Sequence, residues 1–406
     1  MNIQWRRSSF AGVAASAAAV LLLAACGSGG SSNSSSLTGE PVKIGMAVAL
    51  TGQSASIYSL SKGVAESWEE YANSHGGING RPVEILVRDT KSSPAEGLTA
   101  AKELVKSDKV VAMTVLDQVA EPGITSYLAS TDVPMLGNVV SVAAPQKGNF
   151  AVGTIVPAYL PGQMAVAKQL GASKVGQFYC AEAPVCAQTS EIYKRAAPAN
   201  GLQFAGGLAV SYSAPNFTAQ CLQMINDGVD FLELDLSTAS AKRVVGDCTK
   251  QGFKGTYGMP TSSFAVSAFK GLPGARFGGT LSAFPWWVDA PAVNTFRDAM
   301  AKHSPDLDYR TQVSTSVWVM LDLFAKRVGG TADLTPATAV AALKATTNES
   351  LDGLLPETIS TGTPWPEMKC YWMWTYEAGA DDPKLLPAIG TSGNGQSGPL
   401  ATTCSS

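Results

Sequence analysis

The chain has 406 residues, of which 45% are hydrophobic and 15% charged, and its formal net charge at pH 7 is −3. This composition is typical of a globular protein that is long enough to form two lobes with separate cores. Because no run of Lys and Arg occurs, the sequence argues against nucleic acid or an anionic membrane surface as a partner.

The first 25 residues are predicted to be a signal peptide. A head with two arginines precedes the apolar run Phe10–Ala25, which is shorter than the about 20 residues of a bilayer span, and Leu23-Ala24-Ala25-Cys26 matches a lipoprotein cleavage box. We expect lipid on Cys26 to anchor the protein to the membrane outside the cytoplasm, and residues 26–40 to form a Gly/Ser-rich tether. An ordinary cleaved signal followed by an unmodified Cys26 is the alternative.

The next segment has the pattern of a βαβ unit. Val42–Leu50 alternates as a strand does, the polar turn Thr51–Ser54 ends it, and apolar residues at helical spacing follow from Leu60 to Ala72. The glycine-rich run Gly76–Pro82 ends the helix, and Val83–Asp89 is predicted as the second strand. Such a unit is a right-handed crossover onto a parallel sheet.

These residues resemble the opening of the branched-chain-amino-acid-type substrate-binding proteins of ABC importers. The resemblance rests on Thr51-Gly52, Tyr58, Gly63 and above all Gly76-Gly77-Ile78-Asn79-Gly80-Arg81-Pro82, and it covers roughly residues 41–380. It implies a type I periplasmic-binding-protein fold, in which two lobes close on a small-molecule ligand. It also implies a monomer that works with an ABC permease and its ATPase subunits, with no cofactor and no enzymatic activity.

Strands and helices are expected to alternate along the rest of the chain. The predicted strands are Val110–Leu116, Val133–Leu136, Val175–Tyr179, Leu208–Tyr212 and Phe231–Leu236. The predicted helices are Glu96–Lys106, Ile124–Ala129, Met164–Leu170, Glu191–Asn200, Phe217–Asp227, Ala239–Gln251, Ala292–His303 and Thr315–Val328. This repetition predicts an α/β fold of two doubly wound parallel-sheet lobes, with ligand-facing loops at the carboxyl ends of the strands.

Three crossover strands are expected to join the lobes, near Ala151–Pro157, Gly279–Trp287 and Leu351–Thr361. The predicted first lobe comprises residues 41–155 and 286–355, and the second comprises residues 156–285 and 356–390. Within the second lobe, the aromatic segment Met368–Tyr376 is expected to form a hairpin. Residues 391–406 are expected to be a tail that is mobile except where Cys404 holds it.

The chain has seven cysteines, which suits a compartment outside the cytoplasm. With lipid on Cys26, six remain, and fifteen pairings of six cysteines are formally possible. We expect neighbours to pair, giving the disulfides Cys180–Cys186, Cys221–Cys248 and Cys370–Cys404. A metal site is the weaker alternative, because the sequence has no Cys-x2-Cys pair and only two histidines.

Candidate ligand contacts from the first lobe follow from the resemblance. Tyr58 stands where the family has an aromatic lid, in the loop after the first strand, although it could be a surface tyrosine. Asp117 and Gln118 stand where the family usually has a serine pair for the ligand carboxylate, and Ser141 fits a second hydroxyl contact or a helix cap. Because Asp117 would repel a carboxylate, either it turns away or the ligand presents a donor there.

The second lobe offers Glu182 and Ser237 at the ligand side, and Trp286 at the return crossover. Met259-Pro260-Thr261 falls where relatives that bind α-amino acids place a carboxylate for the ammonium group, and no acidic residue stands there. We therefore expect a neutral, donor-bearing or aromatic organic molecule, such as an amide, more than a leucine-like zwitterion.

Two other functional classes remain open. A sensory lipoprotein could use the same two-lobed body without transport. A hydrolase is a remote alternative, because Ser59 and Lys62 match a serine-x-x-lysine pattern but its companion motifs are missing. The chain also lacks a phosphate-binding Gly-x4-Gly-Lys motif, so the energy for transport would come from a partner ATPase.

Overall fold

The computed structural model describes residues 37–137, 148–154, 156–182, 184–260, 262–359 and 367–405. Strands and helices alternate through most of these ranges, and the strands form two main sheets. No helix within the described ranges has the length and apolarity needed to cross a bilayer.

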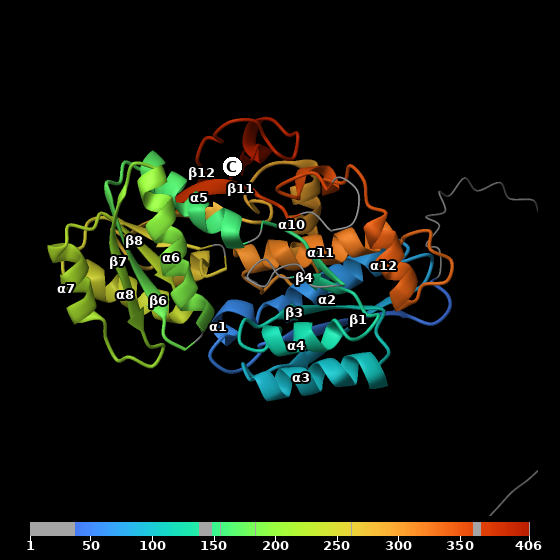
Figure 1. The fold of residues 1–406 in the computed structure, drawn as a ribbon. Helices are drawn as coiled ribbons and strands as arrows, with labels where there is room; N and C mark the ends of the chain where they lie inside the picture. Colours follow the sequence, from blue (N-terminus) through green and yellow to red (C-terminus); the bar gives the residue numbers. More distant parts are fainter. Residues whose placement is uncertain are drawn as a thin grey trace, which may run out of the picture. The chain divides into compact units, whose positions relative to one another are not determined.

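The first sheet has the strand order β2-β1-β3-β4-β5, and all neighbouring strands are parallel. Its strands are β1 (Val42–Val48), β2 (Val83–Asp89), β3 (Ala112–Leu116), β4 (Met135–Gly137) and β5 (Asn149–Ala151). Helices α2 (Ser61–Ser74) and α11 (Gln312–Val328) pack on one face, and α3 (Pro94–Lys102) and α4 (Glu121–Leu128) pack on the other (Figure 1). With α1 (Ala55–Tyr58), α10 (Pro291–His303) and α12 (Pro336–Lys344), they make up the first lobe.

The second sheet has the order β12-β11-β10-β9-β8-β6-β7, and β13 pairs with β11 beside it. Its strands are β6 (Lys174–Cys180), β7 (Gln203–Val210), β8 (Phe231–Asp235), β9 (Thr256–Met259), β10 (Arg276–Leu281), β11 (Cys370–Glu377), β12 (Lys384–Leu385) and β13 (Thr403–Cys404). The strands from β7 to β10 are parallel, and β11 runs antiparallel to β10, β12 and β13. The helices of this second lobe are α5 (Val156–Gln169), α6 (Pro184–Ala199), α7 (Thr218–Asn226), α8 (Thr238–Lys250) and α9 (Val266–Phe269).

The predicted α/β class with two lobes is confirmed, and its sheets are mostly parallel, with antiparallel pairing at β11, β12 and β13. The differences in element bounds have local causes. The strand expected at Leu208–Tyr212 is Gln203–Val210, because two glycines inside it hide the strand pattern. The helix expected from Met164 begins at Val156, and Pro161 lies within it. The helix expected to run to Lys106 changes at Glu103 into a π-helical turn, Glu103–Ser107. Neither β9 nor α12 was predicted.

The glycine-rich run that carries the resemblance has a structural role in the first lobe. Gly77 has φ +60°, and a Cβ there would lie 2.0 Å from the Arg81 carbonyl oxygen, so no other residue fits this turn. Asn79 Nδ2 donates to the carbonyl oxygens of Thr331 at 2.8 Å and Val328 at 3.3 Å. The turn therefore holds the loop that follows α11.

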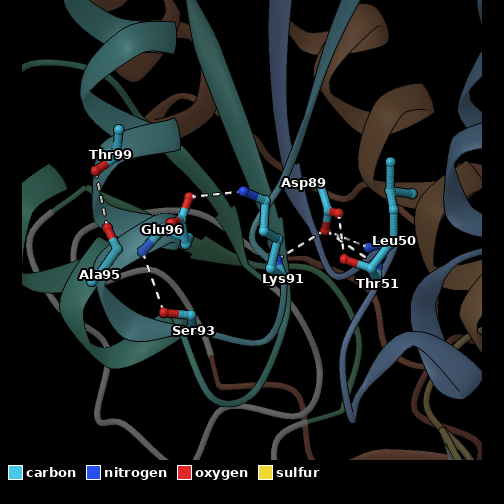
Figure 2. Close-up of polar contacts among 8 residues, drawn as sticks. All are labelled: Leu50, Thr51, Asp89, Lys91, Ser93, Ala95, Glu96 and Thr99. Carbon is cyan, nitrogen blue, oxygen red and sulfur yellow. Dashed lines mark hydrogen bonds and ion pairs between the residues drawn. The ribbon is translucent and has the colours of Figure 1, made fainter.

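Asp89 organises the loop after β1, as Figure 2 shows. Its Oδ1 accepts from the backbone N–H groups of Leu50 at 3.0 Å, Thr51 at 3.2 Å and Lys91 at 2.8 Å, and its Oδ2 accepts from Thr51 Oγ1 at 2.6 Å. Partial burial disfavours the charge, but these hydrogen bonds outweigh it and lower the pKa of Asp89. On the neighbouring turn, Ser93 caps α3 by accepting from the Glu96 N–H (Figure 2).

Replacing Asp89 with asparagine is expected to lower the free energy of unfolding by about 1 kcal/mol at pH 7, because charge-assisted hydrogen bonds are lost at a partly exposed site. A carboxyl with a lowered pKa stabilises the fold above its unfolded value, near 3.8, and loses that contribution as the pH falls. Urea denaturation should therefore show a smaller difference at pH 3.5 than at pH 7, with exposed Asp132→Asn as the control. The same difference at both pH values would contradict this role.

Three disulfides form as expected, Cys180–Cys186, Cys221–Cys248 and Cys370–Cys404. Residues 391–405, which were expected to be mobile except at Cys404, make further contacts with the rest of the chain. Buried Asn394 donates to the carbonyl oxygens of Leu355 and Leu400, and Thr402 Oγ1 donates to the Pro356 carbonyl at 2.9 Å. Side-chain to backbone hydrogen bonds of this kind hold a segment without any hydrophobic periodicity, so the sequence pattern could not reveal them.

Candidate functional site

A pocket opens where the carboxyl ends of strands from both sheets meet. In the first lobe it is lined by Ile57 of α1 and by Gln118, which follows β3. The second lobe supplies the rest of the lining: Val156, Tyr159, Leu160, Cys186, Thr189, Tyr212, Asp235, Leu236, Pro260, Ser262 and Ser263. In open α/β sheets, ligands bind at this end of the strands.

Gln118 and Tyr212 approach each other across the pocket from the two lobes. Gln118 Nε2 lies 3.5 Å from Tyr212 Oη, at the limit of a hydrogen bond. Glu182 positions Tyr212, because its Oε1 accepts from the Tyr212 N–H and from Ser211 Oγ, both at 2.7 Å. Burial raises the pKa of Tyr212 to about 12, so at neutral pH it presents a neutral hydroxyl group to the pocket.

Asp235 is the one charged side chain among the described residues that line the pocket. It ends β8, whose residues alternate: Leu232 and Leu234 belong to a core cluster that includes α7 and α8, whereas Phe231 packs with residues of α5 and α6. Glu233 and Asp235 point to the same side as Phe231. Two carboxyl groups therefore face α5 and α6, and the second of them reaches the pocket.

Three donors hold the Asp235 carboxylate. Thr189 Oγ1 donates to Oδ2 at 3.0 Å, Tyr193 Oη donates to Oδ1 at 3.3 Å, and Gln177 Nε2 also donates to Oδ2. Burial raises the pKa of Asp235 to about 6, although these hydrogen bonds favour its charged form. Asp235 is thus mostly ionised at pH 7 in a partly desolvated position, where a cationic or donor-bearing partner would stabilise it.

Glu233 lies deeper in the same lobe, and its surroundings favour the neutral form of its carboxyl group. Burial, followed by the neighbouring charge of Asp235, raises the pKa of Glu233 well above its usual value. Gln163 Nε2 donates to Glu233 Oε2 at 3.2 Å. Gly258 makes room for this side chain, because a Cβ at position 258 would lie 2.4 Å from the Glu233 carboxyl carbon. The pair is a buried acid and amide rather than an ion pair.

Glu233→Gln is expected to raise the free energy of unfolding by more than about 1 kcal/mol at pH 8, because the amide needs no proton in order to be buried. A carboxyl group whose pKa is raised in the folded protein stabilises the fold below its unfolded pKa, which is about 4.5. That contribution is lost as the pH rises toward the folded pKa. Urea denaturation between pH 5 and 8 should give a falling curve for the wild type and a flatter one for the variant. Exposed Glu377→Gln is the matched control, and parallel curves for the wild type and the Glu233 variant would refute the raised pKa of Glu233.

The structure gives Asp117 a role within its own lobe. Its side chain is buried; Thr90 Oγ1 donates to Oδ2 at 2.5 Å and the Val119 N–H donates to Oδ1 at 2.9 Å. Its backbone carbonyl accepts the Glu121 N–H at 2.9 Å, at the start of α4. Of the two outcomes considered for Asp117, the carboxylate turns away from the pocket.

Three other predicted contacts, Tyr58, Ser237 and Trp286, are not among the residues that line the pocket. Tyr58 belongs to α1 and is fully buried, not placed in a loop as expected, and its neighbour Ile57 lines the pocket. Ser237 caps α8 by accepting from the Ser240 N–H, and its own N–H bonds to Tyr212 Oη. Trp286 is buried, and its Nε1 donates to Asp382 Oδ1 at 3.3 Å.

Two predicted residues, Ser141 and Thr261, lie outside the described residues. Pro260 and Ser262, on either side of Thr261, both line the pocket. Position 259–261 has no carboxylate, but β8, the adjacent strand of the sheet, supplies one through Asp235.

Sequence reasoning missed Asp235, Tyr159, Thr189 and Tyr212. A signal for Asp235 was present, because Phe231–Leu236 carries acidic residues at alternate positions of a strand that is otherwise apolar. Tyr212 was placed at the end of a strand instead of in the loop after it. Tyr159 and Thr189 lie on the parts of α5 and α6 that precede the helices predicted there.

A larger hollow of about 380 Å³ lies at the opposite ends of the strands in the second lobe. Its charged residues include Asp230, Lys254 and Arg276. Asp230 accepts from the N–H groups of Ser173 and Lys174, and Arg276 donates to the Lys254 carbonyl at 2.7 Å. Because Asp230 and Arg276 already make hydrogen bonds within the protein, this hollow is a weaker candidate than the pocket.

Ser59 and Lys62, which match the serine-x-x-lysine pattern, do not line the pocket. Lys62 pairs with Glu66, and Ser59 is an exposed residue at the end of α1. In the described part of the chain, no group of three or more His, Cys, Asp or Glu side chains could hold a metal ion.

Comparisons with known proteins agree with this architecture. The leucine-binding protein LivK of Thermotoga maritima is 16% identical, with a TM-score of 0.72 over 85% of this chain and 98% of its own. LivJ of Streptococcus pneumoniae, solved with isoleucine, is 16% identical, with a TM-score of 0.73 over 86% of this chain and 99% of its own. A fatty acid ABC transporter substrate-binding protein of Thermomonospora curvata is 18% identical, with a TM-score of 0.74 over 86% of this chain and 92% of its own.

At this level of identity, these structures establish the fold alone. No curated protein matches the chain significantly. The family model described as periplasmic binding protein matches residues 41–380. The chain therefore belongs to the periplasmic binding protein family, whose members bind solutes outside the cytoplasm.

Proposed function

We propose that this protein is the solute-binding component of an ABC importer, anchored to the membrane through lipid on Cys26. It captures a small organic molecule between its lobes and delivers it to a permease. The observation that carries the proposal is the pocket at the carboxyl strand ends, which is lined from both lobes by Gln118, Tyr212 and Asp235. The transporter named for the Thermomonospora relative and the amino acids named for the Liv relatives support the same class of function.

The pocket supports capture by closure. Its free volume is about 60 Å³, whereas small-molecule sites usually enclose about 300–1,000 Å³. The lobes must therefore separate before a ligand enters and close again around it, and Gln118 and Tyr212 face each other where that motion would open the pocket. A ligand that contacts both lobes stabilises the closed state only to the extent that it binds the closed state more tightly than the open state.

The lobes are joined by three chain passages. The proposed hinge follows the boundaries expected from the sequence, with residues 41–155 and 286–355 in one lobe and residues 156–285 and 356–390 in the other. In this arrangement a rotation of one lobe opens the pocket without disturbing either sheet. A sensory role without transport would use the same closure, but no structural feature favours it.

Mass spectrometry tests the proposal directly. Mature protein is purified gently, denatured, and the released small molecules are identified. The expected result is one organic molecule in near-stoichiometric amount. This molecule should bind again to the refolded protein, which should be a monomer. Chemical conversion of that molecule by the protein would overturn the proposal, and so would the absence both of a bound molecule and of any binding in a broad metabolite screen.

A further inference from the structure

The charge of the pocket limits the kind of ligand it can hold. Asp235 brings a negative charge to the lining, and the lining residues that the structure describes include no Lys, Arg or His. A ligand carboxylate placed here would therefore meet a like charge with no described cation to balance it. A ligand cation would meet a complementary charge.

The carboxylate is oriented for such a partner. Gln177 and Thr189 donate to one oxygen and Tyr193 to the other, which leaves part of its acceptor capacity unused. The side chain is partly exposed, and the pocket is the space it lines. A primary ammonium group carries three donors and fits an oxygen that is already fixed by its neighbours.

The remaining walls suit an apolar body. Tyr159 and Tyr212 supply aromatic surface, and Ile57, Leu160 and Leu236 supply aliphatic surface. Aromatic rings near an ammonium group add cation–π attraction. The hydroxyl groups of Ser262 and Ser263 and the Gln118 amide are neutral, so they can bind polar atoms without demanding a charge.

We infer that the ligand is a small primary amine with an apolar aromatic or aliphatic body, which binds as a cation to Asp235 and needs no carboxylate. This inference rests on the proposed function and names the substrate class of the same site. Because the amine binds the ionised carboxylate of Asp235, its affinity should fall as this carboxylate is protonated at lower pH. In the described part of the chain, the titratable groups around Asp235 include Glu233 on its own strand, Tyr159 on α5, Tyr193 on α6 and Tyr212 after β7. Burial raises the pKa values of Glu233, Tyr193 and Tyr212, so these two tyrosines stay neutral between pH 5 and 7 and the carboxyl group of Glu233 is shifted toward its neutral form.

The test uses two sets of compounds that share one carbon skeleton and differ in charge. One set is 3-methylbutylamine, leucine and 4-methylpentanoate, and the other is 2-phenylethylamine, phenylalanine and 3-phenylpropanoate. In calorimetric titrations of the mature protein at pH 7, the better amine should bind at least tenfold more tightly than its zwitterion, and the anions should not bind. Lowering the pH from 7 to 5 should weaken amine binding about tenfold, because the pKa of Asp235 is about 6.

Asp235→Asn should weaken amine binding at least tenfold and abolish its pH dependence. Exposed Asp227→Asn in the same lobe is the matched control and should leave both unchanged. If Asp235→Asn does not fold, as circular dichroism would show, the pH profile of amine binding by the wild type still tests the inference.

Each other outcome overturns the inference. Tighter binding of a zwitterion or an anion would refute the substrate class while the proposed function stands. No binding by any of the six compounds would also refute it, and the released molecule then shows whether capture itself fails.

Discussion

Replacing both Cys221 and Cys248 with alanine is expected to lower the free energy of unfolding by about 3.5 kcal/mol. These residues link α7 to α8 across 27 positions, and chain entropy of the unfolded state sets the size of the effect. Both cysteines are buried in the core cluster that includes Leu232 and Leu234 of β8, so the disulfide also fixes α7 and α8 on the face of β8 opposite Asp235. Urea denaturation at pH 7 measures the change.

The Cys180–Cys186 disulfide is the matched comparison, because it closes a segment of only six positions. The same chain-entropy relation gives about 2 kcal/mol for its removal. The larger loss should therefore belong to the pair that lies farther from the pocket. Equal losses, or a larger loss at Cys180–Cys186, would show that loop length does not set how much each disulfide contributes to the free energy of unfolding.

Tyr212→Ala is expected to weaken ligand binding about 30-fold, which corresponds to about 2 kcal/mol. The substitution removes an aromatic wall of the pocket and the hydroxyl group that meets Gln118 of the other lobe. Titration with whichever of the six test compounds binds the wild type most tightly measures the loss. The ring contributes most of the expected energy, because it buries most of the area.

Tyr212→Phe separates the two contributions. It keeps the ring and removes the hydroxyl, so its loss should stay below about fivefold. A full loss in Tyr212→Phe would assign the effect to the hydrogen bond, and an unchanged affinity in Tyr212→Ala would place the ligand elsewhere.

The fold followed from the sequence because its determinants are local and periodic. Buried parallel strands such as Ala112–Leu116 are apolar at nearly every position, and the helices between them show spacings of three and four. Errors occurred where another constraint masks the pattern. Two glycines conceal β7, and a proline lies inside α5. The tail is held by hydrogen bonds of Asn394 and Thr402, which leave no periodic signature.

The site was less predictable because function depends on where side chains meet. The sequence placed Gln118 correctly at a strand end, and the structure brings it to the pocket. It could not show that Asp117, one residue earlier, would turn inward to Thr90. Nor could it show that a carboxylate missing from position 259–261 would come from the neighbouring strand. To see that Asp235 of β8 lies beside the end of β9, one must know the order of the strands in the sheet, which only the structure gives.

Small-angle X-ray scattering with and without ligand tests the central claim most directly, which is that a small molecule closes two lobes around itself. We predict that the radius of gyration of the mature protein falls when the molecule identified by mass spectrometry saturates it. A compound from the same series that does not bind should leave the scattering curve unchanged. Identical dimensions at saturation and without ligand would contradict the account.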